Sequence, residues 1–245
     1  MDNIFIPHGI ANLHEAREFV EFADAHITNK PFEMRLCGSE ADWLTIRRGH
    51  IGASQAGTVL GLTDAWKTRR QLWEEFTGRR VDTFEGNEYT RRGQQEEPLI
   101  RALWAIEHPD WDVYDGTFLH FRSRTEPWRS CSLDMIAVER ATGRIIVGEI
   151  KTGVWHKAWG GDNIPDAYLA QISQQVDITQ FAGAVVIARL MPPTDFGAVE
   201  KGGAGRMLYY SREELAENMA YVRREVNDFW ASIQEGKFRV KVSMI

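Results

Sequence analysis

SCSLDMIAVERATGRIIVGEIKT, residues 130–152, is the stretch that decides the fold. It contains two apolar runs, 133–138 and 145–150, that are rich in β-branched and aliphatic residues. The Ala-Thr-Gly segment between them is typical of a hairpin turn, centred between Ala141 and Thr142. We therefore expect two antiparallel strands joined by a tight turn.

The far end of this hairpin carries two acids and a lysine. With that turn, Asp134 lies opposite Glu149, and facing residues have Cβ atoms roughly 5 Å apart. Lys151 points the same way because side chains alternate along a strand. The turn end of this face carries Ile136, Val138, Ile145 and Val147.

Two carboxylates held this close repel each other unless a cation lies between them. Hard oxygen ligands favour Mg²⁺ or Mn²⁺. The pattern of Asp134, Glu149 and Lys151 is what a magnesium-dependent nuclease needs. The alternative is that the three are solvated residues on the polar face of an exposed hairpin.

Further motifs occur in order around this pair. They are RRGHIGAS at 47–54, GQQEE at 93–97, CSLD at 131–134, EIK at 149–151 and AYLAQ at 167–171. On these motifs the chain resembles, over about residues 43–190, the phage lambda exonuclease and YqaJ-type viral recombinase family, a branch of the PD-(D/E)XK nucleases. In one departure, Leu133 stands where the family usually has proline, which leaves the acidic ligand in place.

The resemblance implies a role for each matching residue. Asp134, Glu149 and the backbone carbonyl of Ile150 would hold the first metal ion. Glu97 would complete the site or help to hold a second ion, so two Mg²⁺ ions are expected, with Mn²⁺ as a substitute. Lys151 would position or help to deprotonate the attacking water and offset charge on the phosphate.

Two of the candidate residues also have structural alternatives. Pro98 directly after Glu97 indicates a helix start, where an acid is favoured by the helix dipole. Pro165 predicts the start of a second helix, which carries Gln171 on a polar stripe with Gln175. Gln171 is expected either to bond to water or phosphate at the metal site or to lie at the surface.

Arg47 and Ser54 fit a phosphate rather than a metal. Ser54 opens the apolar segment 56–62, which favours a helix N-cap whose neighbouring N–H groups face an anion. Arg47 can donate a bidentate pair to the same phosphate. By resemblance, this pocket receives the terminal 5′-phosphate of the digested strand. Helix capping alone is the structural alternative for Ser54.

Composition indicates an ordinary globular protein. The 245 residues, 43% hydrophobic and 26% charged, can bury one sizeable core. We expect a single nuclease domain over 1–245, with a helical extension at 1–38, the core at 39–211 and a C-terminal helix and tail at 212–245. Two cysteines make no disulfide framework, and no secretory or membrane-length segment is visible, so we expect no membrane partner. The cytoplasm of a bacterial host is the expected location, and the resemblance implies a phage or prophage origin.

The net charge of −6 does not exclude a DNA partner, because the position of positive charges matters more than their sum. Basic residues cluster before Glu97 at Arg47–Arg48, Lys67 with Arg69–Arg70, Arg79–Arg80 and Arg91–Arg92. These clusters favour a basic groove; solvated helix faces are the alternative.

Helices dominate the first part of the chain and strands the second. We expect helices at 12–26, from Ser39, after Ser54, at 69–76, at 97–107, after Pro165 and from Ser211 to Gly236, and strands at 117–121, 184–191 and 207–211 besides the hairpin. The fold class is α/β, with a central mixed sheet flanked by helices. The resemblance implies the restriction-endonuclease-like core of the PD-(D/E)XK class.

Two loops are candidates for DNA contact. The segment 155–164 contains two tryptophans, a histidine and a lysine beside two glycines, which suits base stacking. A hydrophobic lid over the core is the alternative. The second is the glycine-rich loop 192–205.

Other enzyme classes lack their motifs. The segment 52–56 misses the second glycine of a nucleophile elbow, 203–205 misses the third glycine of a dinucleotide site, and the histidines show no zinc spacing.

The resemblance therefore implies a Mg²⁺-dependent 5′-to-3′ exonuclease that acts on linear double-stranded DNA ends and leaves 3′ single-stranded overhangs for phage-type recombination. It also implies a ring-shaped homotrimer and a single-strand annealing protein as partner. A structure-specific or restriction-like endonuclease on the same fold, and a non-catalytic DNA-binding module, are the rival hypotheses.

Overall fold

The computed structural model describes residues 10–63, 67–82, 88–154, 157–160, 163–191 and 205–240. The elements, in chain order, are α1 (Ile10–His26), β1 (Phe32–Leu36), α2 (Glu40–Arg47), β2 (Ile51–Gly52), the 3₁₀ turn η1 (Ala53–Gln55), α3 (Ala56–Val59), α4 (Arg69–Phe76), α5 (Glu88–Glu107), β3 (Trp111–Asp115), β4 (Leu119–Ser123), β5 (Arg129–Cys131), β6 (Met135–Glu139), β7 (Ile145–Val154), η2 (Lys157–Trp159), α6 (Asp166–Thr179), β8 (Gly183–Met191), β9 (Gly205–Ser211) and α7 (Ala216–Gln234).

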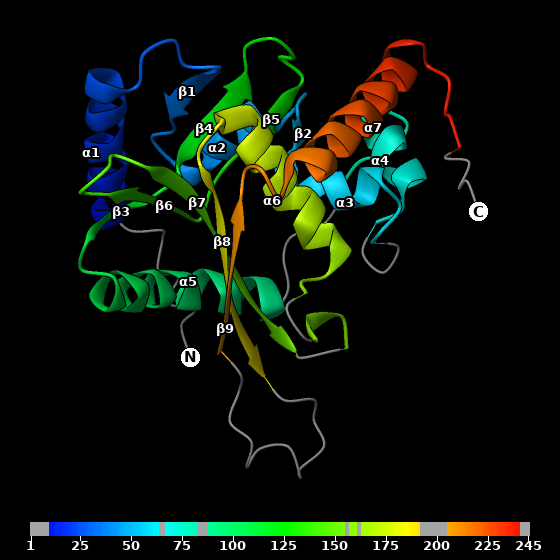
Figure 1. Ribbon diagram of the computed structural model, residues 1–245. Helices are drawn as coiled ribbons and strands as arrows, with labels where there is room; N and C mark the ends of the chain where they lie inside the picture. The colour runs from blue at the N-terminus through cyan, green and yellow to red at the C-terminus, as the bar shows by residue number, and fades with distance from the viewer. Residues whose placement is uncertain are drawn as a thin grey trace, which may run out of the picture.

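Two mixed sheets form the centre of the molecule (Figure 1). The five-stranded sheet has the order β3-β6-β7-β8-β9, and the four-stranded sheet has the order β1-β4-β5-β2. β7 and β8 run parallel, and α6 supplies the crossover that such a pair requires. The predicted α/β class with a mixed sheet is confirmed, while the second sheet was not predicted.

The hairpin of β6 and β7 has the predicted register. Met135 pairs with Gly148 and Val138 pairs with Ile145, which places Asp134 opposite Glu149 at the next position. Because side chains alternate along each strand, the two faces of the hairpin pack against different clusters. Ile136, Val138 and Val147 belong to the main core with Ile145 packed against it, whereas Met135, Ala137 and Ile146 pack with Trp104 of α5.

The helix α1 contributes to the main core. Phe19 is completely buried and its ring lies 6.5 Å from that of Phe121 and 6.3 Å from that of Phe181. Aromatic pairs at these separations stabilise a core beyond simple area burial. The boundaries of the predicted helical extension, core and tail stay predictions.

The helix α5 starts earlier than the sequence indicated. It begins at Glu88 and contains Pro98 in its interior, so Glu97 lies in the middle of the helix and not at its N-terminus. Proline removes one N–H donor and leaves the carbonyl four residues earlier, that of Gln94, without its helical partner. The exposed position of Gln94 gives that carbonyl access to water.

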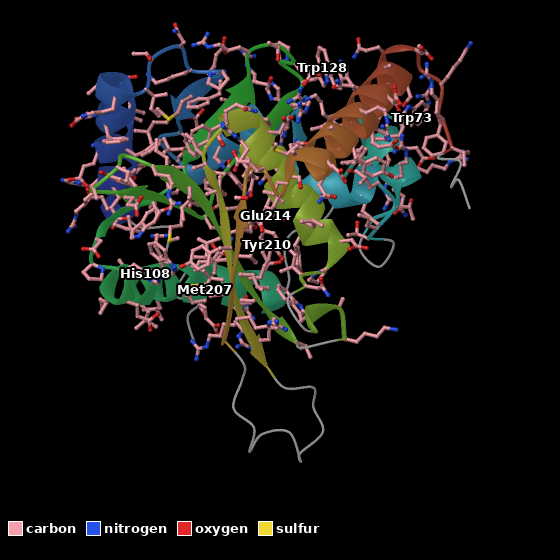
Figure 2. All side chains as sticks on the ribbon, in the orientation of Figure 1. Trp73, His108, Trp128, Met207, Tyr210 and Glu214 are labelled. Atoms are coloured by element: carbon pink, nitrogen blue, oxygen red, sulfur yellow. The ribbon has the colours of Figure 1, made fainter. Side chains whose placement is uncertain are left out.

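The last helix packs on a buried cluster of the same chain. Val222, Val226 and Phe229 of α7 share a buried cluster with residues of α3 and α4. Two tryptophans anchor this helix (Figure 2). The indole N–H of Trp73 donates to the Ser232 carbonyl at 3.1 Å, and that of Trp128 donates to the Asn227 side chain at 3.0 Å.

None of the helices described is both long enough and apolar enough to cross a membrane.

Candidate active site

The candidate site lies where β7 passes between α6 and α5 (Figure 1). Glu149 of β7 is only 1% exposed and receives three donors. Gln171 Nε2 lies 2.6 Å and Lys151 Nζ 2.5 Å from its Oε1, and Gln175 Nε2 lies 2.6 Å from its Oε2. The structure therefore brings Glu149, Lys151 and Gln171 into direct contact. Gln171 donates to the carboxylate itself, and its side chain is partly buried.

Asp134 completes the acidic pair from the start of β6. Its Oδ2 accepts a hydrogen bond from the backbone N–H of Ile150 at 2.8 Å. In an antiparallel pair the N–H and C=O of one residue point to the same neighbour. The carbonyl of Ile150 therefore faces the Asp134 side of β7, where the sequence predicted a metal ligand.

Glu97 reaches the same region from α5. The helix α5 packs on β7 near Gly93, where a Cβ would lie 3.4 Å from both Thr152 Oγ1 and Glu97 Oε1. Burial raises the pKa of Glu97, Lys151 lowers it, and the Glu149 carboxylate raises it again. Glu97 is thus within electrostatic range of the pair.

The charges of the site perturb one another. Burial raises the pKa of Asp134 well above its ordinary value, and the carboxylates of Glu149 and Glu97 raise it further. Burial alone would lower the pKa of Lys151, but the carboxylates of Glu149 and Asp134 outweigh this effect and raise it. Lys151 is therefore held in its protonated form.

The donor chemistry of the site fits a hard divalent cation. Asp134, Glu149 and Glu97 supply carboxylate oxygens; burial raises the pKa values of Asp134 and Glu97, and neighbouring carboxylates raise both further. As they stand, no three His, Cys, Asp or Glu side chains within the described ranges lie close enough together to hold a metal ion. The strand register places Asp134 opposite Glu149, and Glu97 approaches them from α5.

Arg47 and Ser54 form a second polar group. Arg47 Nη2 donates to Ser54 Oγ at 3.1 Å, and its guanidinium lies 4.1 Å from the ring centre of Trp43. The predicted N-cap role of Ser54 is wrong, because Ser54 lies inside η1. The Gln55 side chain instead accepts from the N–H of Gly52, at 3.0 Å, and closes this turn.

Trp43 connects the two groups. Its indole N–H donates to Ser132 Oγ at 3.0 Å, and Ser132 lies two residues before Asp134. Side-chain contacts therefore run from Arg47 through Trp43 to Ser132, and the backbone continues from Ser132 to Asp134. Sequence reasoning missed Trp43, whose position one helical turn before Arg47 was the available signal.

Arg101 is a second missed residue. It is buried, its Nη2 lies 2.6 Å from Asp115 Oδ2, and its Nη1 donates to the backbone carbonyl of Asp134 at 3.2 Å. An arginine inside an otherwise apolar helix face is the signal that could have found it. Its contact helps to fix the backbone at Asp134.

Several of the basic clusters are paired with acids. Lys67 contacts Glu75 at 2.6 Å and Asp82 at 2.7 Å. Two further pairs join residues one helical turn apart, Arg70 with Glu74 at 3.0 Å and Arg92 with Glu96 at 2.6 Å. These pairs reduce the positive charge available to the predicted groove.

The predicted role of the segment 155–164 can be compared with the structure at one of its two tryptophans. Trp159 is 2% exposed and its ring lies 5.4 Å from that of Tyr168, so it covers the core as the lid alternative required. Trp155 and His156 lie outside the described residues, as does the segment 192–204 of the glycine-rich loop.

A family model described as "YqaJ-like viral recombinase domain" matches residues 42–182. A protein of Bacillus subtilis (strain 168), "Uncharacterized protein YqaJ", is 25% identical over 158 residues, which cover 62% of this chain and 47% of that protein. The chain thus spans about half the length of this curated relative.

Solved structures with the same fold include LHK-Exo, an alkaline exonuclease from Laribacter hongkongensis. The structure in complex with dAMP has a TM-score of 0.61 at 19% identity, covering 80% of this chain and 93% of that one. A second structure of the same exonuclease has a TM-score of 0.52 at 17% identity, covering 80% and 95%. These similarities show that the chain shares its fold with this exonuclease.

Proposed function

We propose that this chain, which belongs to the YqaJ-like viral recombinase family, is a metal-dependent deoxyribonuclease that degrades one strand of linear duplex DNA from its 5′ end and leaves a 3′ overhang. The observation that carries the proposal is the buried contact of Glu149 with Lys151 and Gln171, directly opposite Asp134. The alkaline exonuclease fold of the structural relatives supports it.

The proposed cofactor is Mg²⁺, with Mn²⁺ as a substitute. Asp134, Glu149 and the carbonyl of Ile150 would hold one ion, and Glu97 would help to hold a second. When bound, such ions supply Lewis-acid assistance to phosphodiester hydrolysis and offset charge on the phosphate. The crowded negative charge at Asp134 and Glu97 supports this assignment.

The chain's own residues have separable tasks in this proposal. Lys151 would position or help to deprotonate the attacking water and would offset charge on the scissile phosphate, from its place beside Glu149. Gln171 orients the Glu149 carboxylate to which it donates.

Strand polarity is proposed from the pocket at Arg47 and Ser54. Arg47 forms no ion pair with an acid in the part of the chain that the structure describes, and burial lowers its pKa. A guanidinium that is partly desolvated and lacks an acidic partner is suited to a phosphate. We propose that it binds the terminal 5′-phosphate.

The proposed setting is phage-type recombination in the cytoplasm of a bacterial host. A single-strand annealing protein would act on the 3′ overhang, and a ring-shaped homotrimer would enclose the duplex. Sedimentation of the purified chain measures the oligomeric state directly. A monomer at micromolar concentration would contradict the ring.

The decisive experiment compares linear and covalently closed circular duplex DNA, each with Mg²⁺ or with chelator. We expect only linear DNA to be degraded, and only with Mg²⁺. Cutting of the closed circle would instead favour the endonuclease hypothesis. Binding without cleavage of either substrate would favour the non-catalytic module.

A further inference from the structure

Gln175 lies on α6 one turn after Gln171, and its side chain is completely buried. Its Nε2 donates to Glu149 Oε2 at 2.6 Å and to the backbone carbonyl of Ser132 at 3.2 Å. Ser132 lies two residues before Asp134. One amide group therefore contacts both the strand that carries Glu149 and the segment that leads to Asp134.

The amide of Gln175 is not explained by packing. Its Oε1 is buried and has no hydrogen-bond partner within the described part of the chain. A buried acceptor without a partner is unfavourable, and methionine would fill similar space without one. The two contacts of Nε2 therefore account for an amide at this position.

The neighbouring Gln174 provides a comparison. It is equally buried on α6, and its Oε1 also lacks a partner among the residues described. Its Nε2 donates to the backbone carbonyls of Ile51 at 2.9 Å and Ser130 at 3.1 Å. Gln174 thus joins two backbone segments, whereas Gln175 joins a backbone segment to the Glu149 carboxylate.

We propose that Gln175 is a positioning residue that sets the orientation of Glu149 relative to Asp134 in a divalent-cation site. Its bond holds Glu149 Oε2 against α6, while Oε1 accepts from Gln171 of the same helix and contacts Lys151. The inference rests on the proposed nuclease function. Removing a side chain that orients a metal ligand typically changes metal affinity or activity about 10–100-fold.

The test compares Gln175→Met with the matched control Gln174→Met in the full chain. Mn²⁺ alone is titrated first, without DNA, while the thermal unfolding midpoint is recorded. Wild type and Gln174→Met should reach half-saturation at the same Mn²⁺ concentration, whereas Gln175→Met should need about 10–100-fold more. Gln175→Leu, which also removes the amide donor and adds no metal ligand, carries the same expectation if Gln175→Met does not fold.

Degradation of linear duplex DNA gives a second readout. At saturating Mn²⁺, Gln175→Met should lower kcat and leave KM for DNA unchanged, because the pocket at Arg47 is untouched. Equal Mn²⁺ half-saturation in the two methionine variants would overturn the role of Gln175 and leave the nuclease proposal intact. A wild-type chain that neither responds to Mn²⁺ nor degrades linear DNA would overturn both.

Discussion

The carboxylate site at β7 and the pocket at Arg47 have opposite electrostatics. Glu149 is 1% exposed, and it lies beside Asp134 in a region where crowded negative charge raises the pKa of Asp134. Arg47 is partly exposed, stacks on Trp43, and contacts a neutral hydroxyl at Ser54. The first region holds three acidic side chains against the single ammonium group of Lys151, whereas Arg47 in the second region has no acidic partner among the described residues. A divalent cation and a phosphate, respectively, are the ligands that would complete them.

Asp134→Asn should have the largest effect, and activity and stability should change in opposite directions. The asparagine keeps an oxygen for the Ile150 N–H but removes one of the crowded charges. We expect degradation of linear duplex DNA to fall by about a thousandfold, roughly 4 kcal/mol of transition-state stabilisation. The thermal unfolding midpoint without divalent cation should stay the same or rise. Near wild-type degradation would contradict the site assignment.

Arg47→Ala should have a smaller and more selective effect. Losing a charged hydrogen-bond donor to phosphate corresponds to roughly 1.5–3 kcal/mol, or about 10–100-fold in rate. We expect that loss on duplexes with a 5′-phosphate and little change on duplexes with a 5′-hydroxyl. Arg48→Ala, which alters the exposed neighbour, is the matched control. An equal loss of rate on 5′-phosphate and 5′-hydroxyl ends would contradict the proposed strand polarity.

The pH dependence of stability should distinguish the two regions again. Because the folded-state pKa values of Asp134 and Glu97 are raised, the folded chain keeps protons that the unfolded chain has released. Their stabilising contribution is full below the unfolded-state pKa values and is lost as pH rises through the folded-state values. We expect the free energy of unfolding of the wild-type chain, measured in urea without divalent cation, to decrease as pH rises over this range.

The slope with pH should be shallower in Asp134→Asn and unchanged in Arg47→Ala. Adding Mg²⁺ near neutral pH should restore part of the lost free energy of unfolding in wild type. Identical slopes in wild type and Asp134→Asn would mean that Asp134 is not the group that holds the extra proton.

The hairpin was predictable because its determinants are local. The alternation of apolar residues and one tight turn specify the pairing of Val138 with Ile145, and that pairing fixes Asp134 opposite Glu149. The role of Gln175 was not predictable, because it depends on how α6 lies against the hairpin. A polar residue on a helix does not reveal which distant carboxylate it will contact.

Helix α5 shows how a sequence pattern can be correct and still incomplete. Leu99, Leu103 and Ile106 do share one side, but they are 60%, 57% and 75% exposed. Ile100 and Trp104 make the buried side instead, with 7% and 2% exposure. Periodicity identifies an apolar stripe, whereas contact with the sheet decides which side is packed. The start of α5 was missed because proline is also favoured in the first turn of a helix.

Trp43→Phe should have the smallest effect, and it tests whether the two regions act together. The phenylalanine keeps an aromatic ring for Arg47 but removes the hydrogen bond to Ser132 Oγ. A net loss of ~1 kcal/mol predicts a rate about fivefold lower on 5′-phosphate ends. Trp128→Phe is the matched control, since it also removes one indole bond of 3.0 Å, to Asn227 at α7. If both variants lower the rate equally, the hydrogen bond from Trp43 to Ser132 supports only the fold. If only Trp43→Phe lowers the rate, that hydrogen bond aligns the phosphate site at Arg47 with the carboxylates.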